Sequence, residues 1–256
     1  MIKKRMIFTL LFDEGNFVLS RNFSRQSIGD LHWLDKNYNF SNIYKYIDEM
    51  VILNVSNNRT KSNKKKFIFS IKYLSENCFM PISAGGGIDS LEEAKEMLEN
   101  GADKIIINSN LIKGNLIKKL AHAFGRQCVV GSLDFKKINK EKHAIFINNG
   151  QNRIKNLIND YIKKIDPKLV GELLINSMDK DGTGTGLDFK ILKYFKKNKI
   201  PLIFQGGVGN SKHFIEGLKN KNIQAVSTAN LLNFVDDGIK QARIKILQQK
   251  INIPSR

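Results

Sequence analysis

Apolar runs alternate with amphipathic stretches along the whole chain, and this rhythm predicts a parallel β-sheet with helices between its strands. The apolar runs are typical of buried strands and lie near residues 5–11, 49–55, 80–84, 104–108, 129–134, 172–178, 201–205 and 225–228. Residues 90–100 predict a helix, because Ser90 is a suitable N-cap, acidic residues follow, and apolar residues recur at helical spacing, namely Leu91, Ala94, Met97 and Leu98. Two polar stretches, 22–39 and 57–66, are expected to be long loops.

An internal repeat organises the chain. Residues 81–110 and 201–230, which lie 120 positions apart, share one pattern: a proline, an apolar strand, a glycine turn, an amphipathic helix and a second strand that ends in asparagine. Other segments pair at an offset of 123, which aligns Leu11 with Asp134. The sequence therefore consists of two similar halves of about four β/α units each.

Two such halves favour an α/β fold, specifically a (β/α)8 TIM barrel. We expect a single barrel domain over residues 1–256, with half-barrels at about 1–123 and 124–256. An open, doubly wound sheet would satisfy the same alternation of strands and helices.

Composition and charge narrow the class of function. The chain is 41% hydrophobic and 26% charged, which is typical of a globular protein. The net charge of +18 allows nucleic-acid binding, but the lysines are scattered, and their tight cluster at 61–66 has no interleaved aromatic residues. Cys78 and Cys128 lie far apart, the histidines lack ligand spacing, and no apolar run reaches the ~18 residues of a membrane span. We expect a cytoplasmic protein with no metal or other cofactor, which binds small anions rather than nucleic acid or membrane.

Glycine turns at matching places in the two halves predict two phosphate sites. Each turn follows a strand and precedes a helix, so an anion can approach bare backbone N–H groups and the positive end of the helix dipole. A plain tight turn would require the same glycines. A third turn, 179–186, adds carboxylates and flexible backbone. The expected phosphate-binding residues are Gly86, Gly87, Asn108, Ser109, Gly182, Thr183, Gly206, Gly207, Ala229 and Asn230.

Several motifs resemble one family. They are Lys4-Arg5, Gly85-Gly86-Gly87, the run 101–108, Leu133-Asp134, and the run 178–183 with its Asp-Lys-Asp-Gly-Thr sequence. Over nearly the whole chain, the sequence resembles the HisF-type cyclase subunit of imidazole glycerol phosphate synthase; the related isomerase of the same pathway is a weaker match. The resemblance implies a glutamine amidotransferase complex: a HisH-type glutaminase docks at the N-terminal face of the barrel, and ammonia passes along its axis to a phosphorylated substrate at the C-terminal face.

The match fails at the implied substrate face. The family uses two catalytic aspartates, at the ends of strands one and five; Asp134 is the second, and Leu11 replaces the first. Further departures are Leu19 in place of lysine, Asn54 in place of an acid, Gln205 before the second glycine pair and Asn230 in place of serine. We expect Asp134 to act as acid or base, helped by Asp181.

The opposite face keeps the pattern of the family. Four charged residues, each at the beginning of a predicted strand, match the ring that surrounds the ammonia entrance, and Asp103 would lie beside them at the partner interface. The ring residues are Arg5, Glu49, Lys104 and Glu172. Their spacing alone also suits a structural salt-bridge ring.

The resemblance implies a synthase subunit that receives ammonia but has an altered acceptor. Relatives of this cyclase serve in acetamidino modification of surface-sugar precursors, and the loss of the first aspartate resembles that branch. The acceptor would then be phosphorylated or nucleotide-linked. Two alternatives stay open: the ordinary cyclase of histidine biosynthesis, and a non-catalytic ammonia conduit that activates the glutaminase.

Overall fold

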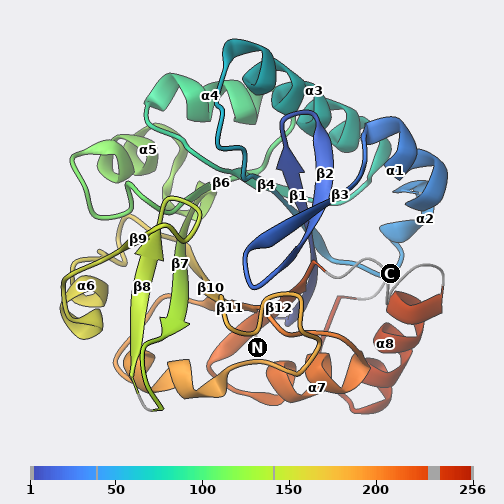
Figure 1. Ribbon diagram of the computed structural model, residues 1–256. Coiled ribbons are helices and arrows are strands. Elements are labelled where there is room, and N and C mark those ends of the chain that lie inside the picture. The colour runs from blue at the N-terminus through green and yellow to red at the C-terminus, as the bar shows by residue number, and fades with distance from the viewer. Residues whose placement is uncertain (1–2, 39, 141, 230–236, 255–256) are drawn as a thin grey trace.

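Eight parallel strands pair edge to edge around a closed barrel, so the predicted (β/α)8 fold is confirmed (Figure 1). In chain order the barrel strands are β1 (Arg5–Asp13), β4 (Glu49–Asn54), β5 (Ile82–Gly85), β6 (Lys104–Ile107), β7 (Val129–Lys137), β10 (Glu172–Ser177), β11 (Leu202–Gln205) and β12 (Ile223–Thr228). Pairing of β10 with β7 and of β12 with β1 closes the barrel. This computed structural model describes residues 3–38, 40–140, 142–229 and 237–254.

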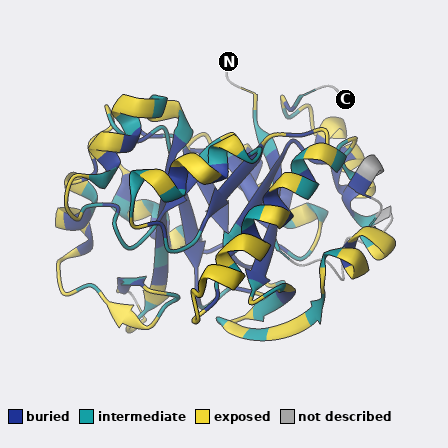
Figure 2. Ribbon diagram, turned by 90° about the horizontal axis from the view of Figure 1, so that it is seen from above, coloured by how far each residue is buried: buried dark blue, intermediate teal, exposed yellow. Residues whose placement is uncertain are grey.

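Helices surround the barrel and cover its outer surface. They are α1 (Leu31–Tyr38), α2 (Phe40–Ile43), α3 (Lys61–Asn77), α4 (Leu91–Glu99), α5 (Leu116–Phe124), α6 (Ile158–Lys163), α7 (Ser211–Lys219) and α8 (Asp237–Gln248), with short 3-10 helices at Arg126–Cys128 and Phe189–Phe195. Figure 2 shows the consequence for burial: the barrel strands are buried, and the helices expose their outer faces. Among the residues described, no helix is both long and apolar enough to cross a membrane.

Helix α4 illustrates how local sequence sets these elements. The Ser90 side chain caps it by accepting a hydrogen bond from the Glu93 amide at 3.1 Å. Ala94 and Met97 are buried, and the leucines of the expected apolar stripe are partly buried against the same core. The predicted helix and its cap are confirmed.

Both expected long loops contain regular structure. Residues 22–39 include β3 (Ser24–Gly29), which forms a hairpin with β2 (Asn16–Arg21), followed by α1. Thr60 caps α3 by accepting from the Asn63 amide at 3.2 Å, so the lysine cluster forms the first turns of that helix. A second hairpin, β8 (His143–Ile147) and β9 (Asn152–Arg153), extends β7. The loop prediction for 22–39 was wrong because a short hairpin with a polar outer face lacks a long apolar run, whereas the prediction for 57–66 holds for residues 57–60.

The barrel interior is layered from its N-terminal to its C-terminal end. Four charged residues occupy the N-terminal end, and above them lies an apolar layer formed by Ile7, Val51, Ile106, Val130, Leu174, Ile203 and Ala225. Higher still, Thr9 donates to Gln205 at 3.1 Å and lies 2.7 Å from the Ser227 hydroxyl. The polar layer leads to the open C-terminal end.

The strand register repeats between the two halves. Leu11 lies opposite Leu53 in the β1–β4 pair, and Asp134 lies opposite Asn176 in the β7–β10 pair, 123 residues later. Leu11 and Asp134 therefore occupy equivalent positions on two different strands. The division into half-barrels within one domain stays a prediction.

Candidate functional site

Two adjoining cavities open at the C-terminal ends of the barrel strands. One, of about 440 Å³, lies over the ends of β4, β5 and β6, and the other, of about 550 Å³, lies over β11 and β12. Both are bordered by the β2–β3 hairpin, and four residues line both of them: Ser20, Arg25, Asp181 and Gln205. The C-terminal end of a (β/α)8 barrel is where active sites of this fold are built.

The first glycine turn lies in the smaller cavity. Gly86 and Gly87 have φ of 113° and 69°, conformations that L side chains rarely adopt, and a side chain on Gly86 would clash with the backbone of Asn54. The predicted residues Asn108 and Ser109 line the same cavity. The Arg59 guanidinium lies directly against Gly87, so a fixed positive charge accompanies the bare backbone. Sequence analysis missed Arg59, whose only signal was its place in a polar segment after a strand.

The second glycine turn lies in the larger cavity. Gly206 and Gly207 have φ of 94° and 95°, and Gly182 and Ala229 line the same space. Arg21 and Arg25 line it from the β2–β3 hairpin, and the Arg25 guanidinium is paired with the Asp13 carboxylate at 2.9 Å. Thr183 is not among the residues that line either cavity, and its hydroxyl donates to the Lys180 carbonyl at 2.8 Å. The expected site residue Asn230 lies outside the described residues.

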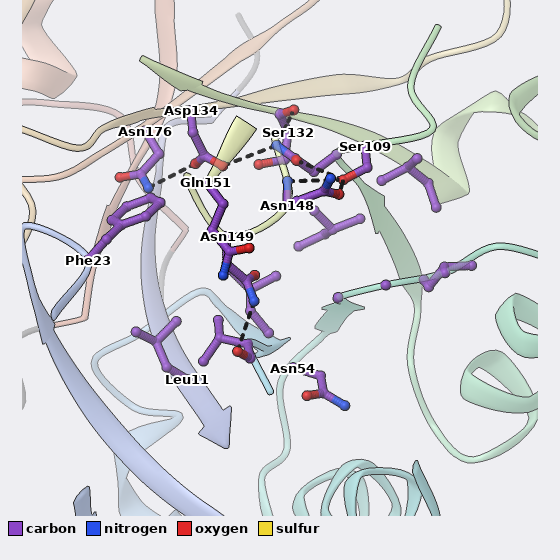
Figure 3. Close-up of a pocket in the computed structure, with 18 of the residues that line it drawn as sticks. Leu11, Phe23, Asn54, Ser109, Ser132, Asp134, Asn148, Asn149, Gln151 and Asn176 are labelled. Carbon is purple, nitrogen blue, oxygen red and sulfur yellow. Dashed lines mark hydrogen bonds between the residues drawn. The ribbon is translucent and has the colours of Figure 1, made fainter. Parts of the chain in front are cut away.

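Asp134 is held in the smaller cavity by amide groups from both neighbouring strands (Figure 3). Asn176 on β10 donates to its Oδ1 at 3.1 Å, and Asn108 at the end of β6 donates to its Oδ2 at 3.1 Å. The pKa of Asp134 is raised to about 6: burial is the largest cause, the Asp181 carboxylate adds to the rise, and the two amides oppose it. A carboxyl that titrates near neutral pH suits proton transfer.

Asp181 is buried and is bound to the β2–β3 hairpin. Its carboxylate accepts hydrogen bonds from the Ser20 hydroxyl and, at 3.0 Å, from the Phe23 amide; its carbonyl accepts from the Asn22 amide at 2.9 Å. Burial raises its pKa above the ordinary value, and these donors oppose that rise. The sequence predicts a role in proton transfer for Asp181, and the structure shows that Asp181 also anchors the β2–β3 hairpin.

The wall formed by β1 and β4 is less polar. Leu11 and Leu53 line the cavity there, and Leu11 is 8% exposed. Asn54 also borders the cavity, but its Oδ1 accepts the Ser56 amide at 3.0 Å and so supports the local turn. Leu19 belongs to β2 and lines the larger cavity. A second proton-transferring group is therefore lacking on this wall of the site as described.

The four predicted ring residues meet at the N-terminal end of the barrel. Arg5 pairs with Glu49 at 2.5 Å and also with Glu172, while Lys104 lies 3.1 Å from Glu49 and 2.8 Å from Glu172. Bases and acids alternate around the axis. Burial alone would raise the pKa of Glu172, but Arg5 and Lys104 hold it below its ordinary value. The two bases thus favour the ionised form of Glu172.

Asp103 lies at the same end and is exposed. Its carboxylate accepts the Ile82 amide at 2.8 Å, which ties the loop before β6 to β5. Within the described part of the chain, no group of three or more histidine, cysteine or acidic residues could hold a metal ion.

The fold and the cavities define a class: a (β/α)8 barrel with glycine turns in both halves, a titratable carboxylate at its C-terminal end and a charged ring at its N-terminal end. Comparison with known proteins gives the family. The model of the histidine biosynthesis protein family matches residues 16–236, and the chain belongs to this family as a HisF-type cyclase subunit.

Relatives from bacteria and archaea support this assignment. A Parasynechococcus marenigrum protein, provisionally named imidazole glycerol phosphate synthase subunit hisF2, is 45% identical over 95% of this chain and 90% of its own length. Imidazole glycerol phosphate synthase subunit HisF of Clostridium botulinum strain 657 is 36% identical over 95% of each chain. The HisF subunit of Methanococcus vannielii is 33% identical over the full length of both.

Proposed function

We propose that this chain is the synthase subunit of a glutamine amidotransferase complex, which receives ammonia from a HisH-type glutaminase and adds it to a phosphorylated or nucleotide-linked acceptor. The observation that carries the proposal is a contrast between the two ends of the barrel. The charged ring is complete at one end. At the other end Asp134 is present on β7, but Leu11 occupies the equivalent position on β1.

The ring supports the ammonia-entry half of the proposal. Four charges facing one axis gain little stability over apolar packing, because their desolvation offsets their attraction. A purely structural barrel end has no need of them. Rearrangement of these ion pairs would open a passage along the axis, and Asp103 beside the ring would contact the glutaminase.

The cavities support the acceptor half of the proposal. Arg59 lies beside the first glycine turn, and Arg21 lines the cavity of the second, an arrangement that suits phosphate oxygens. Between the turns, Asp134 would transfer the proton, and Asp181 would hold the hairpin over the ligand. A polar, amide-rich lining suits a ligand with many hydroxyl or amide groups.

Acetamidino modification of surface-sugar precursors is the reaction we favour, because the loss of the strand-one carboxylate separates this site from ordinary cyclase chemistry. The second candidate is the cyclase of histidine biosynthesis, which the names of the relatives favour. A non-catalytic conduit that only activates the glutaminase is the third.

Reconstitution with the glutaminase subunit of the same organism tests the proposal. We expect this chain to bind it and to raise its glutamine hydrolysis, and we expect nitrogen-15 from glutamine to enter a sugar-nucleotide acceptor. Absence of both binding and activation would overturn the proposal. Rapid formation of imidazole glycerol phosphate would favour the histidine-pathway cyclase, and activation without incorporation into any acceptor would favour the conduit.

A further inference from the structure

The Asp134 carboxylate accepts one amide hydrogen on each oxygen. Strand β7 lies between β6 and β10, and each neighbour contributes an asparagine: Asn108 from one side and Asn176 from the other, both at 3.1 Å. Figure 3 shows the bond from Asn176 to the Asp134 carboxyl group. A proton on either oxygen would point toward a group that can only donate, so the arrangement favours the ionised form.

The equivalent position in the other half provides an internal comparison. There Leu11 lies beside Leu53, in the register that places Asp134 beside Asn176. The carboxylate of Asp134 thus has an amide beside it on the neighbouring strand, whereas Leu11 has another leucine beside it. This correspondence indicates that Asn176 is present because of Asp134, and is not a general requirement of the barrel.

The orientation of the Asn176 amide is also informative. Asn176 is 7% exposed, and its Oδ1 has no hydrogen-bond partner within the described structure. An unsatisfied buried carbonyl is costly, yet rotating the amide would set that oxygen against the Asp134 carboxylate. The contact with Asp134 therefore determines how this side chain lies.

We propose that Asn176 is a positioning residue that keeps Asp134 ionised and fixed in direction, so that Asp134 enters the reaction as a proton acceptor. Asn108 supports it from the other side. A ligand N–H or O–H group gives its proton to a carboxylate oxygen and keeps the electron pair. Only the nature of the ligand rests on the proposed function, because Asn176 positions Asp134 in the protein without a ligand.

Other charged groups around the cavity set the background for this effect. Asp181 raises the pKa of Asp134, and burial raises it most. Arg25 and Arg59 line the same cavity. A change at Asn176 leaves all of these groups in place, so its effect on Asp134 can be measured separately.

The test compares two variants of nearly equal shape in the full chain. Asn176→Thr keeps a hydroxyl that can donate to Asp134, whereas Asn176→Val does not. Carbon-13 NMR of the Asp134 carboxyl gives its pKa directly. We expect the valine variant to raise this pKa by about one pH unit, and the threonine variant to raise it by less than half as much.

Asn149→Gly is the control, because Asn149 lines the same cavity but donates to the Val55 carbonyl at 3.0 Å, and its φ of 53° suits glycine. It should leave the pKa of Asp134 unchanged. Equal pKa values in the threonine and valine variants, or an equal rise in the control, would overturn the inference. Failure of the protein to bind a glutaminase would refute the proposed function and leave these pKa differences intact.

Discussion

Leu11 occupies on β1 the register position that Asp134 occupies on β7. The two positions are related by the internal repeat, and only one of them bears a group that can carry a proton. A ring-forming reaction that moves protons at two points would therefore lack one of its two carboxylates.

From this we predict slow formation of imidazole glycerol phosphate, even when ammonium salts supply ammonia directly. Loss of one general acid or base costs on the order of 10²–10⁴-fold in rate. The measurement is turnover of the histidine-pathway substrate by the purified chain. A rate of ~1 s⁻¹ or more, which is ordinary for enzymes, would contradict the prediction.

The second prediction concerns the stability cost of Asp134. Because burial raises its pKa to about 6, the folded state binds a proton more tightly than the unfolded state does. Its contribution to stability therefore falls as pH rises from about 4 to 6. Replacing the pair by Asp134→Leu and Asn176→Leu, which copies Leu11 and Leu53, should raise the free energy of unfolding at pH 7 by about 1–3 kcal/mol.

Urea denaturation at pH 4 and pH 7 checks this second prediction. The gain should be larger at pH 7, where the buried carboxyl is ionised. In the double variant the Asn108 amide still has a hydrogen-bond acceptor, because it also donates to the Ser132 carbonyl at 3.2 Å. A gain that is larger at pH 4 would show that the pKa of Asp134 is not raised.

The sequence predicts the barrel well because its strands are buried on both faces and leave continuous apolar runs. It also predicts the glycine turns from their positions after strands, whereas the ring is predicted from the resemblance to the HisF-type cyclase. It does not predict the hairpin β8–β9, whose short strands are stabilised by pairing with β7 and carry no strong pattern of their own. The contact of Arg59 with Gly87 depends on how a loop folds back, which spacing along the chain does not specify.

Arg59 leads to the third prediction. If its guanidinium binds phosphate at Gly87, Arg59→Met should weaken the binding of inorganic phosphate at one of the two sites. The dissociation constant should rise by about tenfold or more, as expected for loss of a charge-assisted hydrogen bond. Titration calorimetry and a phosphate-soaked crystal measure this. Arg126→Met is the control, because Arg126 donates to the Pro167 carbonyl at 2.9 Å, before β7 begins. Equal weakening in both variants, or anions bound away from both glycine turns, would count against the assignment.

The fourth prediction concerns a buried ion pair outside the site. Arg243 on α8 lies 3.1 Å from Asp48, with 6% and 1% of the two side chains exposed, and it also donates to the carbonyls of Tyr46 and Pro254. Arg243→Met should cost about 3–5 kcal/mol, because it removes the countercharge of a buried carboxylate. Urea denaturation measures the loss; a cost below about 1 kcal/mol, typical of exposed pairs, would contradict this account.

The last prediction addresses coupling between the two ends of the barrel. Lys104 contacts both acids of the ring, so Lys104→Met removes one countercharge from each while keeping a long apolar stem. Arg5 remains and still holds Glu49 and Glu172. The fold should therefore persist, while the ring loses its alternation on one side. We expect glutamine hydrolysis by the partner to continue and ammonia to escape before it reaches the acceptor.

Ammonia released to solvent per glutamine consumed measures this uncoupling. Lys95→Met is a matched control, because Lys95 forms an exposed pair with Glu99 at 3.5 Å on the outside of α4. Its variant should release no more ammonia than the unmodified chain. Because both variants lose one positive charge and keep the same stem, a difference between them isolates the position of the charge. Equal release in the two variants would mean that the ring has a structural role and does not control ammonia passage.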